Sequence, residues 1–156
     1  MTKAPFEAQE FDLNDQVIEA VKFLSAQAKS GEIGLRSELT RTPLRINGDP
    51  IHLQQVLSNL ILNAMDAVSD ATLVERAVTV TTTQDRGFAE VSVADTGPGV
   101  PPEAAKKIFD PFFSTKKQGM GMGLSIARTI VTAHNGQIAV ENQNGAVFRI
   151  RLPLIT

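Results

Sequence analysis

The first residues that could do chemistry are polar side chains spaced one helical turn apart. Asn59 and Asn63 lie in a mostly apolar segment, about 51–69. Placed at about 100° steps, the polar residues of this segment fall within about 40° of Asn59: His52, Gln55, Asn59, Asn63, Asp66 and Asp70. Because Asn is a poor helix former, two of them in mid-helix require a reason. This polar line is either a solvated face or the lining of a polar cavity, and the spacing alone leaves both open.

Asp95 follows a β-rich segment and begins the sequence Asp95-Thr96-Gly97-Pro98-Gly99. Because side chains alternate along a strand, Asp95 shares a face with Val91 and Val93, and its carboxylate is directed towards the apolar side. A buried carboxylate requires hydrogen-bond donors. It can accept backbone N–H groups of the turn that follows, which is an ordinary role for Asp-x-Gly. It can equally accept an amine or amide of a ligand that the two glycines allow to come close.

A third cluster is the glycine-rich sequence Gly119-Met120-Gly121-Met122-Gly123-Leu124, which opens a predicted helix over 123–134. Backbone N–H groups at a helix N-terminus, together with the positive end of the helix dipole, suit phosphate oxygens. The spacing lacks the Gly-Lys-Ser/Thr that closes a P-loop, and it does not follow a strand as a dinucleotide-binding sequence would. The loop alone therefore does not decide between a phosphate site and a flexible hinge.

These clusters need elements to position them, and the sequence predicts an α+β fold. Apolar spacing predicts a helix over 12–28, and Asp49 followed by Pro50 predicts the start of the helix with the polar line. The helix over 123–134 is expected to end with Asn135-Gly136 as a left-handed cap. Strands are predicted over 33–39, 43–46, 77–83, 88–94, 137–141 and 146–152, with a hairpin loop at 84–87 and a short helical turn within 103–108. The result is about three helices on a mixed, mostly antiparallel sheet.

Composition excludes several classes of protein. The chain has 156 residues, a net charge of −2 and no Cys. This length suits one domain, and the lack of Cys removes disulfides, thiolate metal sites and cysteine nucleophiles. The two His lie far apart without carboxylate-rich spacing, which argues against a zinc site. No apolar run approaches the roughly 18 residues of a membrane span. We therefore expect no direct membrane contact. The nearly neutral charge argues against a nucleic acid partner.

The order of the three clusters, with the sequence Ile108 to Lys116 between the second and third, resembles the ATP-binding catalytic domain of sensor histidine kinases, members of the GHKL ATPase superfamily. The resemblance covers about 12–153 and includes a final box, Gly145-Ala146-Val147-Phe148. The sequences Phe-Phe-Ser-Thr-Lys and Gly-Met-Gly-Met-Gly-Leu are most similar to the oxygen- and nutrient-sensing kinases of the nitrogen-regulatory type. The resemblance implies a two-layer α/β sandwich that binds ATP and Mg²⁺ between its helices, with a mobile lid over about 100–118.

The resemblance also implies roles for single residues. Asp95 would accept the adenine amine, Asn63 would hold Mg²⁺, and Asn59 would be a catalytic residue beside the phosphates. Lys116 would be a second catalytic residue, as a phosphate partner from the lid. The implied nucleotide-binding set is Asn59, Asn63, Asp66, Asp95, Gly97, Gly99, Val100, Ile108, Phe113, Lys116, Gly119, Met120, Gly121, Met122, Gly123 and Leu124. We expect Phe109, Phe112 and Phe113 to pack the lid onto the core or onto a partner.

Three positions bear on the mechanism that the resemblance implies. Asp66 stands where some relatives have Lys, His or Tyr, and Ala146 replaces a Thr or Ser. Relatives that hydrolyse ATP have a Glu general base at the position of Asn59. An amide cannot take a proton from water, whereas a neutral imidazole is already a nucleophile at pH 7. Phosphotransfer to a histidine is therefore favoured over fast hydrolysis.

The acceptor histidine is expected outside this chain. His52 lies within the nucleotide-lining helix, and His134 ends a helix, where a charged or hydrogen-bonded capping role is expected. We interpret residues 1–11 as a linker remnant or a vector-derived start, and residues 12–156 as the catalytic domain. The expected partners are an N-terminal, histidine-containing dimerisation hairpin and a response regulator. The expected location is the cytoplasm, which is compatible with a parent protein that is anchored in the membrane. The alternatives are a non-catalytic nucleotide-sensing module and a serine kinase of the anti-sigma-factor type.

Overall fold

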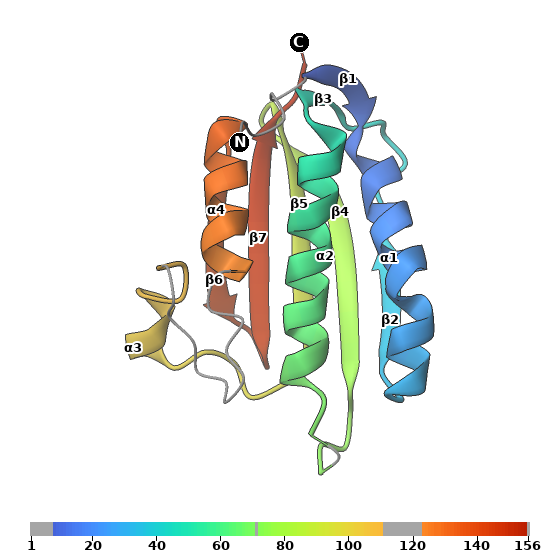
Figure 1. Ribbon diagram of the computed structural model, residues 1–156, viewed down its shortest axis with the longest axis vertical. Coiled ribbons are helices and arrows are strands. Elements are labelled where there is room, and N and C mark those ends of the chain that lie inside the picture. Colours follow the sequence, from blue (N-terminus) through green and yellow to red (C-terminus); the bar gives the residue numbers. More distant parts are fainter. Residues whose placement is uncertain (1–7, 71, 111–122, 156) are drawn as a thin grey trace, which may run out of the picture.

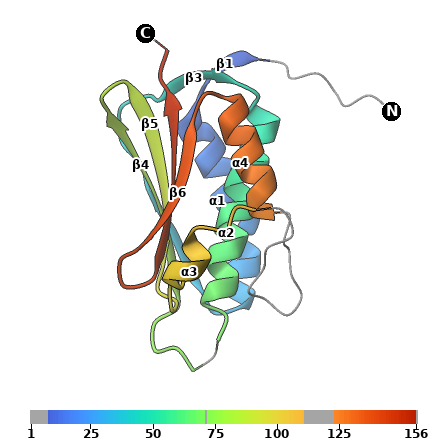
Figure 2. The same ribbon diagram turned by 90° about the vertical axis from the view of Figure 1, so that its left-hand side faces the viewer.

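The structure, a computed structural model, describes residues 8–70, 72–110 and 123–155 and has two layers (Figures 1 and 2). Helices α1, α2 and α4 lie side by side on one face of a five-stranded sheet. The helices are α1 Leu13–Ser30, α2 Pro50–Ala67, α3 Pro102–Ala105 and α4 Gly123–Ala133. The strands are β1 Gln9–Asp12, β2 Gly34–Glu38, β3 Arg45–Gly48, β4 Ala77–Asp85, β5 Phe88–Asp95, β6 Gln137–Asn142 and β7 Ala146–Pro153. The predicted α+β sandwich is confirmed.

The sheet is mixed and mostly antiparallel, as predicted. Its strand order is β2-β4-β5-β7-β6, and of its four pairings only β2 with β4 is parallel. Strands β1 and β3 form a separate antiparallel pair. Side chains of β5 alternate between buried and half-buried, so Val91 and Val93 enter the core beneath α2. The last buried residue of this series is Asp95.

Both long helices begin where the sequence predicts. The Asp12 carboxylate accepts the Asn14 N–H at 3.0 Å and so caps α1. The Asp49 carboxylate accepts the N–H groups of Ile51 and His52 at 3.0 and 3.2 Å, which caps α2. A carboxylate at this position satisfies N–H groups that the helix itself leaves without partners. The cap therefore fixes where α2 begins.

Helix α4 ends as predicted, with one residue in the left-handed region. That residue is Asn135, with φ of 61°, while the Gly136 N–H donates to the Val131 carbonyl at 2.9 Å. This pattern is a Schellman motif. It turns the chain sharply into β6, which returns along the edge of the sheet.

Four details differ from the prediction. The hairpin between β4 and β5 turns over Arg86 and Gly87 alone, both with positive φ, so the predicted four-residue loop at 84–87 was too long. Helix α2 ends at Ala67, which leaves Asp70 outside the helix and removes it from the polar line. Helix α3 spans Pro102–Ala105, about one turn, and so begins one residue before the predicted range 103–108 and ends three residues before its end. Strand β1 was not predicted, and it lies largely within the segment interpreted as a linker remnant.

The segment after α3 is packed onto the core through Phe109. Its ring meets the ring of Phe148, a buried residue of β7, edge to face with centroids 6.1 Å apart. This geometry is favourable for aromatic pairs. The prediction that Phe109 packs on the core is confirmed, whereas Phe112 and Phe113 lie outside the described residues.

Candidate functional site

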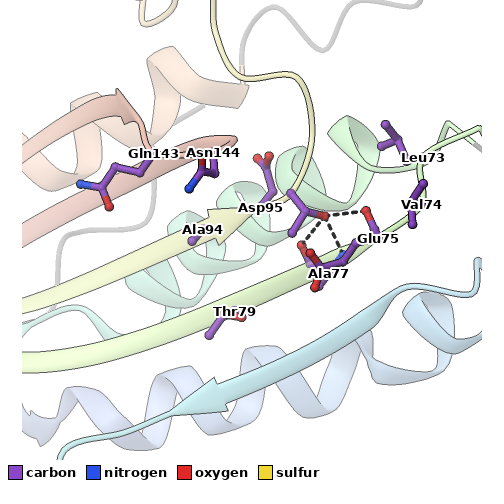
Figure 3. Close-up of a pocket in the computed structure, with 10 residues that line it drawn as sticks. Leu73, Val74, Glu75, Ala77, Thr79, Ala94, Asp95, Gln143 and Asn144 are labelled. Atoms are coloured by element: carbon purple, nitrogen blue, oxygen red, sulfur yellow. Dashed lines mark hydrogen bonds between the residues drawn. The ribbon is translucent and has the colours of Figure 1, made fainter.

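Asp95 carries a buried carboxylate at the end of β5. Only 5% of the residue is exposed, and Oδ1 accepts the N–H groups of Gly97 at 2.8 Å and Ala146 at 3.3 Å. Burial raises the pKa of this carboxyl group, and the two N–H groups oppose that rise. The predicted direction of the side chain is therefore correct. Figure 3 shows the carboxylate pointing to the side of the sheet opposite Thr79.

The turn after Asp95 lies against the last turn of α2. A Cβ atom on Gly97 would lie 2.7 Å from the Ala67 carbonyl oxygen, which leaves room for Gly alone. Asn63 precedes Ala67 by one helical turn and therefore lies on nearly the same side of α2. The turn after Asp95 and the C-terminal end of α2 therefore lie at the same end of the sandwich.

The polar line also contacts the start of α4. The Asn59 Nδ2 group donates to the Gly123 carbonyl at 3.4 Å. Asn59 and Asn63 are half-buried, whereas Gln55 and Asp66 are exposed. The line is therefore not one uniformly solvated face, and its asparagines lie between α2 and the elements beside it.

Val100 is held by a residue that the sequence did not identify as functional. The Val100 N–H donates to Oδ1 of Asn142 at 2.9 Å, and the Asn142 Nδ2 group donates to the Val100 carbonyl at 2.8 Å. The sequence predicted only that Asn142 lies between the strands 137–141 and 146–152, and nothing in it indicated a contact with Val100. Val100, Ile108 and Leu124 of the predicted set are partly buried and pack against the core.

The other predicted residues cannot be placed. Six members of the implied nucleotide-binding set lie outside the described residues: Phe113, Lys116, Gly119, Met120, Gly121 and Met122. Their roles stay predictions. The predicted lid over 100–118 is described only as far as residue 110.

His134 has the hydrogen-bonded role that was expected. Its Nε2 atom accepts the Asp49 N–H at 2.9 Å, and Nδ1 lies 2.8 Å from the Ile130 carbonyl. These partners require a neutral ring with the proton on Nδ1. Burial is the main cause that lowers the pKa of His134. The histidine therefore joins the end of α4 to the cap of α2 and is not presented to a phosphoryl donor.

A cavity of about 370 Å³ lies beside the ends of β4 and β5 (Figure 3). It is lined by Leu73, Val74, Glu75, Ala77, Thr79, Ala94, Asp95, Thr96, Gln143 and Asn144. The Thr96 hydroxyl donates to the Glu75 carbonyl at 2.8 Å and accepts the Ala77 N–H at 3.0 Å. None of the lining residues carries a positive charge, so this cavity is not suited to a triphosphate.

Within the described ranges, no group of three or more His, Cys, Asp or Glu side chains could hold a metal ion. No helix among these residues is long and apolar enough to cross a membrane.

Comparison with known proteins identifies the family. Residues 48–156 match the model of the histidine kinase-, DNA gyrase B- and HSP90-like ATPase family. The chain belongs to this family. The matched residues include the polar line of α2, Asp95 and the start of α4, so the ATPase domain contains the whole candidate site.

Similar proteins are sensor histidine kinases. The chain is 38% identical over 152 residues to the sensor histidine kinase ZraS of Salmonella typhi, a match that covers 94% of this chain and 31% of ZraS. Its fold matches the nucleotide-free catalytic domain of the histidine kinase ThkA, with a TM-score of 0.86, 36% identity and coverage of 95% and 96% of the two chains. ThkA in complex with the response regulator TrrA matches with a TM-score of 0.83 and 33% identity, over 96% of this chain and 42% of that one.

These matches show that the chain has the fold of a histidine kinase catalytic domain and is of the ATP-binding type. The chain spans less than a third of the length of ZraS. The predicted similarity to nitrogen-regulatory and oxygen-sensing kinases stays a prediction.

Proposed function

We propose that this domain binds Mg-ATP and transfers the γ-phosphoryl group to a histidine on a separate dimerisation hairpin of a two-component sensor kinase. The observation that carries the proposal is that helix α2 borders two different chemistries. The turn after the fixed, buried acceptor Asp95 lies against the end of α2, and Asn59 of the same helix reaches the first residue of α4. Family membership and the similarity to ZraS support the same activity.

Asp95 would recognise the base. The carboxylate is acceptor-only when ionised and has about four lone-pair sites, of which two backbone N–H groups use sites on Oδ1. The exocyclic amine of adenine is a donor, which matches the acceptor capacity that remains. The N–H groups of Gly97 and Ala146 hold the carboxylate before a ligand arrives, which reduces the entropy lost on binding. Because Ala146 makes this contact through its backbone, the departure from Thr or Ser does not remove it.

Asn63 would hold Mg²⁺. Its amide oxygen is a hard donor of the kind that Mg²⁺ accepts, and the described residues offer no cage of several acidic groups. Mg²⁺ is usually held by one or two protein ligands together with substrate phosphates and water, so the residues present fit an ion that arrives with the nucleotide. When bound, Mg²⁺ would neutralise charge on the phosphate oxygens.

Asn59 and the start of α4 would position the phosphates. Asn59 contacts the Gly123 carbonyl, so the amide lies where the N-terminus of α4 presents its N–H groups and positive dipole end. An amide is no general base, so the domain provides no means to activate water at this position. A neutral imidazole needs no such help. Its nitrogen forms the new bond to phosphorus as the bond to the ADP oxygen breaks, and positioning with charge stabilisation supplies most of the rate.

The partners follow from this chemistry. The acceptor would be a histidine on a helical hairpin domain, and the phosphoryl group would pass from it to a response regulator. A structure similar to this domain contains ThkA together with the response regulator TrrA. A cytoplasmic location follows from the proposal, since Mg-ATP is the substrate.

Transfer of label from ATP tests the proposed function. The domain is mixed with Mg²⁺, ATP labelled at the γ-phosphate and hairpin domains of several sensor histidine kinases, that of ZraS among them. We expect acid-labile label on a hairpin and none on the same hairpin without its histidine. Acid-stable label would indicate a serine kinase. Nucleotide binding without any transfer would indicate a nucleotide-sensing module.

A further inference from the structure

The turn between β6 and β7 contacts the end of β5 at two places. The Ala146 N–H donates to Oδ1 of Asp95 at 3.3 Å. Gly145 has a φ of 133°, and a Cβ atom there would lie 1.9 Å from the Asp95 carbonyl oxygen. No side chain fits in that space, so Gly145 allows the turn to press directly against the Asp95 backbone.

The last residue of β6, directly before this turn, holds the chain a few residues later. The Asn142 side chain bonds both backbone groups of Val100, accepting its N–H at 2.9 Å and donating to its carbonyl at 2.8 Å. Gly99 precedes this contact with a φ of 85°, and a Cβ atom there would lie 2.7 Å from Oδ1 of Asn142. The amide thus pairs with Val100 as a neighbouring strand would, at a position beyond the last strand residue of β5.

The segment 95–100 is therefore fixed by three elements. Its first residue is held by the start of β7, Gly97 lies against the Ala67 carbonyl at the end of α2, and Val100 is held by Asn142. Only a side chain with both a donor and an acceptor in one plane can satisfy both backbone groups of Val100. Asp offers acceptors alone, and Ala offers neither.

We propose that Asn142 is a positioning residue for the adenine end of the nucleotide. By pinning Val100, it holds the backbone of Gly99 and Val100 beside the Asp95 carboxylate and so keeps the wall of the base site in place. The inference rests on the proposed function, in which Asp95 accepts the adenine amine. It assigns Asn142 no contact with the phosphates, which lie with Asn59 and Gly123 in that proposal.

The test compares Asn142→Ala and Asn142→Asp with Gln143→Ala. Gln143 is the matched control, because it is the next residue along the chain and its side chain donates to Glu141 at 3.3 Å instead. Affinities for adenosine, ADP and Mg-ATP are measured by titration calorimetry. Asn142→Ala should weaken all three by the same factor, about three- to tenfold, as expected for a lost hydrogen-bond pair. Gln143→Ala should stay within about twofold of the wild type.

Amide hydrogen exchange supplies a second readout that reports the contact itself. In Asn142→Ala, protection of the Val100 N–H should fall while that of Val93, inside β5, stays unchanged. Asn142→Asp keeps an acceptor for the Val100 N–H but sets a carboxylate oxygen against the Val100 carbonyl, so it too should weaken adenosine binding. If Asn142→Ala does not fold, the adenosine affinity of Asn142→Asp tests the inference instead.

Four results would overturn the inference. If Asn142→Ala lowers the protection of the Val100 N–H but leaves the adenosine affinity unchanged, Asn142 is a purely structural residue. Loss of ADP and ATP affinity with full adenosine affinity would place its effect at the phosphates. A wild-type domain that binds none of the three ligands would refute the proposed function and this inference with it, whereas normal wild-type binding with equal binding by Asn142→Ala would refute the inference alone.

Discussion

Replacement of Asp95 by Asn should weaken nucleotide binding strongly while the fold is kept. The amide oxygen of Asn can take the place of Oδ1 and accept the same N–H groups, from Gly97 and Ala146. The amide NH₂ group would then stand where the second carboxylate oxygen was. In the proposed function that oxygen accepts the adenine amine, so a donor would face a donor.

The size of the effect follows from the lost bond. A hydrogen bond to a charged group contributes about 1.5–3 kcal/mol. Since about 1.4 kcal/mol corresponds to a tenfold change in affinity, Asp95→Asn should weaken Mg-ATP binding by roughly 10- to 150-fold.

The same substitution should leave the Tm unchanged or raise it, whereas it lowers the affinity for Mg-ATP. Burial raises the pKa of Asp95 above its usual value of 3.8, so the folded state binds this proton more tightly than the unfolded state does. Above the raised pKa, the ionised group therefore lowers the free energy of unfolding, and this cost disappears as pH falls below 3.8. A neutral Asn avoids the cost, so the Tm of Asp95→Asn at pH 7 should equal or exceed that of the wild type.

Calorimetric titration with Mg-ATP and thermal unfolding of the same samples measure both effects. Asp95→Ala is the contrasting variant, because it leaves two buried N–H groups without their acceptor and should lose about 1–3 kcal/mol of stability. The reasoning is refuted if Asp95→Asn binds Mg-ATP within about twofold of the wild type. A fall in Tm as large as that of Asp95→Ala would refute it as well.

Further predictions concern the helices around the site. Burial lowers the pKa of His134 below its usual 6.5, so the free energy of unfolding should fall as pH falls through 6.5 towards the lower folded value. Urea unfolding at pH 7.5 and at pH 5 should show this loss. An equal loss between these pH values in His134→Gln would contradict the assignment of the loss to His134. A Cβ atom on Gly48 would lie 2.4 Å from His134 Cδ2, so Gly48→Ala should destabilise the fold by about 1–3 kcal/mol. Gly34→Ala is the control for Gly48→Ala, because a Cβ atom on Gly34 would lie no closer than 3.8 Å to its nearest neighbour. Equal Tm values for these two variants would show that the contact with His134 is not the cause of the loss. Asn59→Ala removes the bond to the Gly123 carbonyl and should weaken Mg-ATP binding about two- to tenfold while adenosine affinity is kept; an equal loss for adenosine would place Asn59 away from the phosphates.

Local chemistry was sufficient to predict where the main helices begin. Asp12 and Asp49 cap helices because a side-chain oxygen reaches N–H groups two or three residues further on, which needs no tertiary contact. The direction of Asp95 was likewise predictable, since strand alternation is local. Strand β1 was missed because Gln9–Asp12 is short and contains one apolar residue, and its formation depends on pairing with β3.

The roles of Asn142 and of the His134 contact could not be predicted in detail. Asn142 and Val100 are 42 residues apart, and His134 and Asp49 are 85 apart. An Asn beside a turn has an ordinary local explanation, so its type and spacing contain no signal for a distant backbone partner. Such contacts follow from the packing of the sheet and cannot be derived from one segment of sequence.

A crystal structure of the domain with Mg²⁺ and a non-hydrolysable ATP analogue tests the central claim most directly. We expect the adenine amine within hydrogen-bond distance of Asp95 and the triphosphate between the Asn59–Asn63 face of α2 and the start of α4. An analogue bound elsewhere, with Asp95 still bonded to Gly97 and Ala146 alone, would contradict the account.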